Sequence, residues 1–184
     1  MEALGPEVLA ELLMDAIRGD AARQRRVRMA LSSEQSPMEV AADIRKRLVQ
    51  IRRAKSWISI RTQRTLAKEL NGLIEVILNR IAPKDTDLGF DLLWSLLQLA
   101  PHIHSRTDDS SGTIGGIMDA AMEAIQTLAP RLDRAPDLLA DQVFDALQDN
   151  GYGEFDGVIP ALADALGEAG LSALKSRAEA AMLE

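Results

Sequence analysis

The fold of this chain is decided by residues 88–99, which read LGFDLLWSLLQL. Wound as a helix, this stretch is apolar nearly all round and is interrupted by only three polar residues. A helix of that kind is usually buried on most sides. We therefore expect it at the centre of the fold, beginning at a cap on Asp85 or Thr86 and ending at Pro101.

Helix signals recur on both sides of this central helix. Apolar residues return every three to four positions, and Ser36, Pro37 and Glu39 form a capping-box pattern. Strand signals are weak, because aromatic residues make up only 3% of the chain and no run alternates with period two. The pattern predicts about nine helices, near residues 6–18, 20–31, 37–54, 66–82, 86–100, 113–129, 136–148, 156–167 and 171–182.

Short connections between successive helices favour antiparallel neighbours, and such neighbours generate a right-handed stack of helical hairpins. No repeat of fixed period is present in the sequence. A chain of 184 residues is long enough to bury a core of its own. We therefore predict an all-α fold in which residues 1–184 form one domain, an irregular TPR- or HEAT-like helical-hairpin stack.

The charge of the chain is divided along its length. Residues 18–68 hold 14 Lys and Arg against 4 Asp and Glu, a balance of +10, whereas residues 69–184 hold 7 against 20, a balance of −13. The first 17 residues add 4 acids, which completes the net charge of −7. Such a division predicts either an external partner or an internal counter-charge.

Several classes of protein are disfavoured by what the chain lacks. It holds no cysteine, which rules out disulfides and zinc sites built on thiolates. Its N-terminus is acidic and shows no signal-peptide pattern, and its longest apolar stretch is shorter than the ~20 residues that span a bilayer. We expect a soluble cytoplasmic protein with no cofactor, no metal and no membrane contact.

The helix predicted near residues 37–54 carries a cationic face. Its apolar side chains share one side, and basic residues cover the rest and continue into the next segment: Arg45, Lys46, Arg52, Arg53, Arg61 and Arg64. One interpretation is a solvated face whose charge the acidic C-terminal half offsets. The other is a surface for an acidic protein partner or for nucleic acid. Against nucleic acid, the chain is acidic overall and Trp57 is the only aromatic residue among these bases.

A polar segment precedes the helix predicted near residues 113–129. Its distinctive residues are Arg106, Asp108, Asp109, Ser110 and Gly112. As a capping segment, Ser110 or Ser111 would cap the helix and the two aspartates would complement its dipole. As a calcium loop it lacks the acidic residues required at the first and last positions, and as a phosphate cradle it lacks a lysine. The nearby His102 and His104 could hold a metal or act in acid–base chemistry, or could simply be two exposed loop histidines.

A second polar segment, residues 149–160, combines two glycines that permit tight turns with Tyr152, the only tyrosine of the chain, and Asp156. We expect Asp156 to cap the helix that follows. Tyr152 is expected to pack in the corner between helices or to bond a loop carbonyl group.

Together the two polar segments resemble a family of uncharacterised bacterial all-helical proteins classed as a domain of unknown function. The similarity is carried by R-x-D-D-S-x-G at residues 106–112 and by Y-G-x-F-D-G-x-I-P at residues 152–160. Likeness extends to the segments Leu92-Leu93-Trp94 and Ala67-x-Glu69-Leu70, and some members look related to the helical regions that follow SWIM zinc-finger segments. The resemblance implies a TPR- or HEAT-like fold with both polar segments on one edge of the stack, and it carries no activity.

From these features we expect a non-enzymatic helical scaffold that binds a protein partner. Helical stacks present extended binding grooves, and the chain shows no recognisable nucleophile, metal set or cofactor loop. One alternative is a nucleic-acid accessory protein that uses residues 45–68. Another is a metal or small-molecule site, with enzymatic activity, built on Asp108, Asp109, Tyr152 and Asp156. The oligomeric state is left open.

Overall fold

The computed structural model describes residues 36–182, together with residues 8, 11, 12, 15, 18–21, 23 and 24. The first two predicted helices, near residues 6–18 and 20–31, fall mostly outside the described residues. Within the described part every regular element is a helix, and the one β-type pairing there is an isolated parallel bridge between Ile58 and Thr107. The predicted all-α fold is confirmed.

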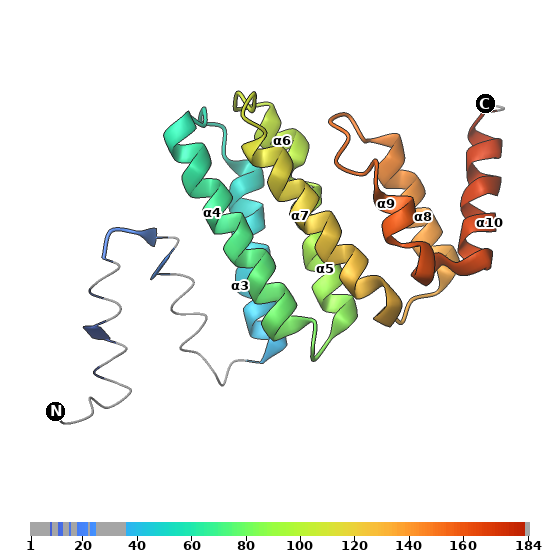
Figure 1. Ribbon diagram of the computed structural model, residues 1–184, viewed down its shortest axis with the longest axis horizontal. Coiled ribbons are helices and arrows are strands. Elements are labelled where there is room, and N and C mark those ends of the chain that lie inside the picture. The colour runs from blue at the N-terminus through green and yellow to red at the C-terminus, as the bar shows by residue number, and fades with distance from the viewer. Residues whose placement is uncertain are drawn as a thin grey trace.

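Successive helices follow one another along the chain, as Figure 1 shows. They are α3 (Pro37–Arg53), α4 (Ile60–Val76), α5 (Thr86–Leu97), α6 (Ala100–His104), α7 (Thr113–Leu128), α8 (Pro136–Gln148), α9 (Val158–Ala161) and α10 (Ala163–Ala181). A π-helical segment, Ile77–Ile81, continues α4, and a 3-10 turn, Ala129–Arg131, continues α7. The predicted total of about nine helices includes the N-terminal region and stays a prediction.

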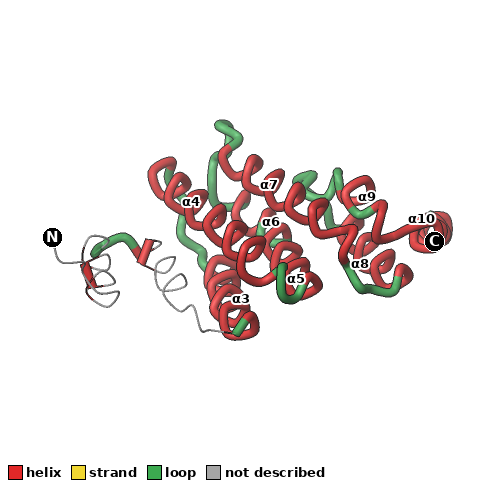
Figure 2. Tube along the Cα trace, turned by 60° about the horizontal axis from the view of Figure 1, so that its bottom comes forward, coloured by secondary structure: helices red, strands yellow, loops and turns green. Residues whose placement is uncertain are grey.

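The described helices form an elongated molecule with two groups. The helices α3, α4, α5, α6 and α7 pack together, and α8, α9 and α10 extend the molecule beyond them (Figures 1 and 2). In the second group α8 and α10 pack side by side. The long axis therefore places α3 and α4 near one end of the described molecule and α10 at the other.

The central helix is α5, as its sequence predicts. Most of its apolar side chains are fully buried, and it packs against α3, α7 and the π-helical segment. Phe90 and Trp94 of α5 continue into Phe155 of the α8–α9 loop as a row of rings whose centroids lie 5.4 and 5.0 Å apart. This row joins the second group of helices to the main core, because aromatic rings bury large apolar areas.

Two predicted helix starts are confirmed in atomic detail. At α3, the Ser36 hydroxyl accepts the Glu39 N–H at 3.3 Å, and the Glu39 carboxylate accepts the Ser36 N–H at 2.9 Å. At α5, the Asp85 carboxylate accepts the N–H of Leu88 at 2.9 Å. Caps of this type stabilise a helix by about 1 kcal/mol each.

The end of α5 differs from expectation. Pro101 does not end this helix, because α5 stops at Leu97 and Pro101 lies in the first turn of α6. A proline fits there, since the N–H groups of a first helical turn have no partner inside the helix. His102 and His104 are therefore helical residues, and the first polar loop begins at Ser105.

Two further boundaries refine the predicted pattern. The helix α4 begins at Ile60, earlier than its apolar stripe indicates, and the Ser59 hydroxyl accepts the Thr62 N–H at 3.4 Å. In α10, Gly167 has φ 54° and ψ −169°, which breaks the helix where the sequence predicts a helix end. Only glycine adopts that backbone conformation without strain.

Candidate functional site

Arg106 ties three segments of the chain together. Its Nε–H donates to the His102 carbonyl at 2.8 Å, and its two NH2 groups donate to the carbonyls of Ser56 at 3.1 Å and Ile51 at 3.2 Å. The acceptors belong to α6, to the α3–α4 connection and to the C-terminal end of α3. Arg106 thus fixes the relative positions of these segments.

Backbone pairing reinforces the same junction. The Ile58 N–H donates to the Arg106 carbonyl at 2.8 Å, and the Thr107 hydroxyl donates to the Ile58 carbonyl at 3.1 Å. Both Ile58 and Thr107 are buried. The α3–α4 connection and the loop before α7 therefore form one ordered unit, although about 50 residues of sequence separate them.

Asp109 is the cap of α7. Its carboxylate accepts the N–H groups of Ile114 and Gly115, each at 2.9 Å, and the side-chain amide of Gln63 at 2.7 Å. The capping interpretation of this segment holds, with the acceptor corrected: neither Ser110 nor Ser111 caps the helix. The N-cap position is occupied by Gly112 at φ 66°, which brings the earlier Asp109 side chain over the helix end.

Asp108 has a separate local role. Its carboxylate accepts the Ser110 N–H at 3.0 Å within the loop. Both aspartates thus accept backbone N–H groups, and the enzyme or metal interpretation of the pair stays a prediction. No cluster of three or more His, Asp or Glu side chains suited to a metal is found among the residues that the structure describes.

A cationic pocket opens beside the Arg106 junction. It has a volume of about 600 Å³ and is lined by Arg52, Arg53, Ala54, Lys55, His102, Ser105 and Arg106. The Nε–H of Arg52 donates to Nε2 of His102 at 3.2 Å, which orients both side chains. The structure thus brings two residues of the predicted cationic face together with one residue of the predicted loop site.

The remaining cations of the predicted face are exposed on α3 and α4. Arg45 and Lys46 lie along α3, and Arg61 and Arg64 lie near the start of α4. These four residues, like Arg52 and Arg53, form no ion pair within the described part of the chain. Their neighbour Arg47 does, because its guanidinium makes two bonds to the Glu69 carboxylate, at 2.6 and 2.7 Å.

Two exposed apolar side chains lie between these cations in the sequence. Trp57 in the α3–α4 connection is 67% exposed, and Ile60 at the start of α4 is 68% exposed. Arg52, Arg53 and Lys55 precede them in the sequence, and Arg61 and Arg64 follow. We call these seven residues the cationic surface.

The second polar loop contacts α6. The ring of Tyr152 stacks on the ring of His104, with centroids 4.9 Å apart and an interplanar angle of 17°. Asp156 does not cap α9 as predicted: Gly157 occupies the N-cap, and the Asp156 carboxylate accepts the Asn150 side-chain amide at 2.7 Å. The Asn150 side chain also accepts the Phe155 N–H at 2.9 Å. Asn150 thus holds the loop together, and the Asp156 carboxylate bonds Asn150 instead of the N-terminal end of α9.

The two polar loops lie along the same edge, the upper one in Figure 1. Among the described residues, no hydrogen bond or ring contact joins Tyr152 or Asp156 to Asp108 or Asp109. The contact between the regions is made by His104 instead. Whether the loops form one binding site therefore stays a prediction.

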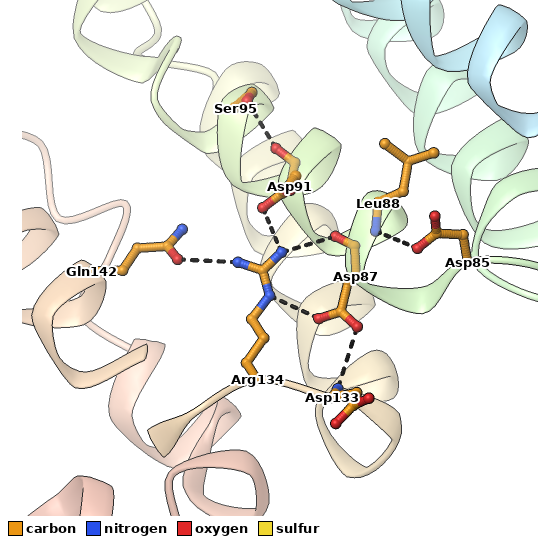
Figure 3. A network of polar contacts seen from close by, with 8 residues as sticks. All are labelled: Asp85, Asp87, Leu88, Asp91, Ser95, Asp133, Arg134 and Gln142. Carbon is orange, nitrogen blue, oxygen red and sulfur yellow. Dashed lines mark hydrogen bonds and ion pairs between the residues drawn. The ribbon is translucent and has the colours of Figure 1, made fainter. Parts of the chain in front are cut away.

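A polar network around Arg134 links the two groups of helices (Figure 3). Its guanidinium donates to the carboxylates of Asp87 at 2.8 Å and Asp91 at 2.7 Å, to the Asp87 carbonyl at 3.2 Å and to the Gln142 side chain at 3.4 Å. It also lies 4.7 Å from the ring centre of Phe90. Burial lowers the pKa of Arg134, but the hydrogen bonds and charges of Asp87 and Asp91 outweigh burial and raise it.

Sequence reasoning missed Arg134 and Gln63. The available signal for Arg134 was the pair Asp87 and Asp91, four residues apart on a helix that is otherwise apolar. The signal for Gln63 was its place on the apolar face of α4, one turn before Ala67 and two turns before Leu70. A polar side chain in an apolar stripe is usually buried only where it has a hydrogen-bond partner. Gln63 is 1% exposed, and its side-chain amide donates a hydrogen bond to the Asp109 carboxylate.

Comparison with known proteins identifies a family whose function is unknown. A family model described as "Family of unknown function (DUF6880)" matches residues 1–184. No curated protein and no solved structure matches the chain. The predicted bacterial origin and the relation to SWIM-associated helical regions stay predictions. Along the part of the chain that is described, none of the helices is both long and apolar enough to span a bilayer.

Proposed function

The chain belongs to the DUF6880 family, and we propose that it is a non-enzymatic scaffold that binds an acidic protein partner through the cationic surface. The helices form an irregular TPR- or HEAT-like stack of hairpins, which displays this surface near one end. The cytoplasm is the proposed compartment. The main supporting observation is that Trp57 and Ile60 are exposed in a segment whose flanking cations have no carboxylate partner in the described residues.

Exposed aromatic and aliphatic side chains with arginine around them have the composition of a binding hot spot. Tryptophan and arginine are enriched where binding energy concentrates in protein interfaces. Trp57 contributes little to the core because most of its surface faces solvent. Contact between this ring and water is unfavourable, so a partner that covers the ring would gain binding free energy.

The partner should be acidic and carry an apolar side chain. Five cations of the cationic surface would meet carboxylates, which steers the encounter and sets the orientation of the partner. An apolar side chain would cover Trp57 and Ile60. The affinity should therefore depend on both salt and the tryptophan.

Nucleic acid is the second candidate, because an exposed tryptophan beside arginines can stack a base. The cationic surface holds one aromatic ring, however, and single-strand binding usually combines several stacking side chains. Protein is therefore the favoured partner.

A photo-crosslinking amino acid with an aromatic side chain at position 57, which keeps a large apolar ring in place of the tryptophan, tests the proposal directly. In cells that make the protein, we expect one discrete protein adduct that survives nuclease treatment and that disappears when Arg52 and Arg53 are both changed to Glu. The matched control is the same amino acid at Leu138, a position on α8 with similar exposure, 69% against 67%. An adduct destroyed by nuclease would assign the surface to nucleic acid, and equal adducts at both positions would contradict the proposal.

A further inference from the structure

The pocket beside the cationic surface has the composition of an anion site. Four cationic side chains, Arg52, Arg53, Lys55 and Arg106, line it, and no Asp or Glu is among its lining residues. The C-terminal ends of α3 and α6 also face this region, and each helix end contributes at most about half a negative charge. They offset about one of the four positive charges, so the pocket remains strongly cationic.

Two of these cations are held in place before any ligand arrives. Arg106 uses three of its five N–H groups on carbonyl oxygens, which leaves two for a ligand. Arg52 uses its Nε–H on His102 and keeps its other N–H groups without a partner in the described residues. Preorganised donors reduce the entropy that binding costs.

The arrangement suits a phosphoryl group better than a single carboxylate. The cations come from the end of α3, from the α3–α4 connection and from the loop after α6, so they line the pocket from several segments. A carboxylate offers two oxygens and one charge, whereas a phosphate ester offers three oxygens and nearly two charges. Arginine forks match the oxygens of phosphate in pairs.

We infer that this pocket binds a phosphoryl group carried by a phosphorylated side chain of the protein partner. The inference rests on the proposed scaffold function for the source of the phosphoryl group, because the pocket shares Arg52, Arg53 and Lys55 with the surface that exposes Trp57. The partner would place its phosphate between Arg106 and Arg53 and its apolar side chain on the tryptophan. Phosphorylation would then switch the interaction on.

Inorganic phosphate tests the pocket without any partner. Added at constant ionic strength, it should shift the NMR signals of the Arg52 side-chain N–H and of the His102 ring in a saturable way. Arg53→Gln and Lys55→Gln should each weaken phosphate binding about tenfold, the effect of losing one charged hydrogen bond. Arg45→Gln and Arg64→Gln each remove one positive charge outside the pocket. Each should weaken phosphate binding less than about twofold.

A shift that rises linearly without saturating, or equal losses in all four variants, would mean a diffuse cationic surface and would overturn the inference. Arg106 is left unchanged in these tests, since its three carbonyl bonds make it part of the fold.

An acidic peptide with one phosphoserine beside a leucine, compared with its unphosphorylated twin, tests the source of the phosphoryl group. We expect the phosphorylated peptide to bind about tenfold tighter, with the advantage lost in Arg53→Gln and kept in Arg64→Gln. Equal binding of the twins, or tighter binding of a single-stranded oligonucleotide, would overturn the assignment to a phosphorylated protein. If phosphate saturates the pocket while position 57 crosslinks no protein, the scaffold proposal fails and the anion site remains.

Discussion

Arg134 links the two groups of helices through polar contacts, beside the aromatic row that ends at Phe155. It lies in the connection before α8 and reaches Asp87 and Asp91 on α5 (Figure 3). The partial burial of the guanidinium strengthens these charged hydrogen bonds relative to those of exposed pairs. The Phe90 ring beneath it adds a cation–π contact.

Changing Arg134 to Ala should lower the free energy of unfolding by about 2 kcal/mol, because it removes several hydrogen bonds and leaves the Asp87 and Asp91 carboxylates without the guanidinium. Amide hydrogen exchange in α8 and α10 should accelerate more than in α3 and α4. Arg131→Ala is the control, since Arg131 is an exposed cation in the same segment. Denaturant unfolding and exchange measure both effects, and equal stability of the two variants would contradict the role of Arg134 as a clamp.

The pH dependence of this clamp follows from the direction of the pKa shift. The pKa of Arg134 is higher in the folded state than in the unfolded state. Its contribution to the free energy of unfolding is therefore fully present at any pH below the unfolded pKa. It is lost only as the pH rises through the raised folded value, far above neutrality. The arginine therefore gives the clamp no pH dependence in the neutral range.

Side-chain roles were only partly predictable from the sequence. The pattern at residues 106–112 indicates a helix cap, and the structure confirms one. The sequence could not show that Asp109 rather than a serine is the acceptor, because that choice depends on the left-handed backbone at Gly112 and on the amide of Gln63, 46 residues earlier. Asp156 fails as a cap for a similar reason, since Asn150 captures its carboxylate.

At the scale of elements, α4 has its charges in an unfavourable order. Its first turn contains Arg61 and no acidic residue, whereas the first turns of α3, α5 and α8 each contain an acid. A cation at a helix N-terminus opposes the helix dipole and costs about 0.3–1 kcal/mol. A locally unfavourable residue of this kind is typical of a binding surface.

Changing Arg61 to Glu should therefore stabilise the fold and impair its function. We expect the free energy of unfolding to rise by about 0.5 kcal/mol, while the adduct captured at position 57 decreases. Lys68→Glu, the same charge reversal deeper in α4, should leave stability within about 0.3 kcal/mol. A loss of stability in Arg61→Glu would contradict the helix-dipole argument, and an undiminished adduct would show that the arginine has no binding role.

Helix existence was predictable, whereas some boundaries were not. The apolar stripes locate α3, α5, α7 and α8 because these helices bury one continuous face, or nearly every face in the case of α5. Pro101 was ambiguous, since a proline both terminates helices and begins them. The sequence alone could not distinguish the end of α5 from the start of α6.

At the scale of the whole molecule, the division of charge is a division in space for the described residues. The cationic surface lies near one end, and acidic residues of α8 and α10 lie toward the other (Figure 1). The cations of the acidic end, Lys175 and Arg177, pair locally with Glu179 and Asp141. Among the described residues, Arg47 of α3 forms an ion pair with Glu69 of the acidic half.

Internal counter-charge therefore explains little of the cationic surface among the described residues. Charges separated by more than about 8 Å in physiological salt are largely screened, so the acidic end cannot neutralise the cationic end at a distance. The sequence could count these charges. It could not show that residues 52–55 and 102–106 meet in one pocket, because that depends on the packing of α6 against α3.

The salt dependence of the affinity for the protein captured at position 57 tests the central claim most directly. We expect the dissociation constant to rise steeply with salt, and the slope to flatten when Arg52 and Arg53 are both changed to Gln. Changing Lys84 and Lys175 to Gln removes the same charge elsewhere and should leave the slope intact. An affinity that does not respond to salt, or an equal flattening in both double variants, would contradict the claim that the cationic surface is the binding site.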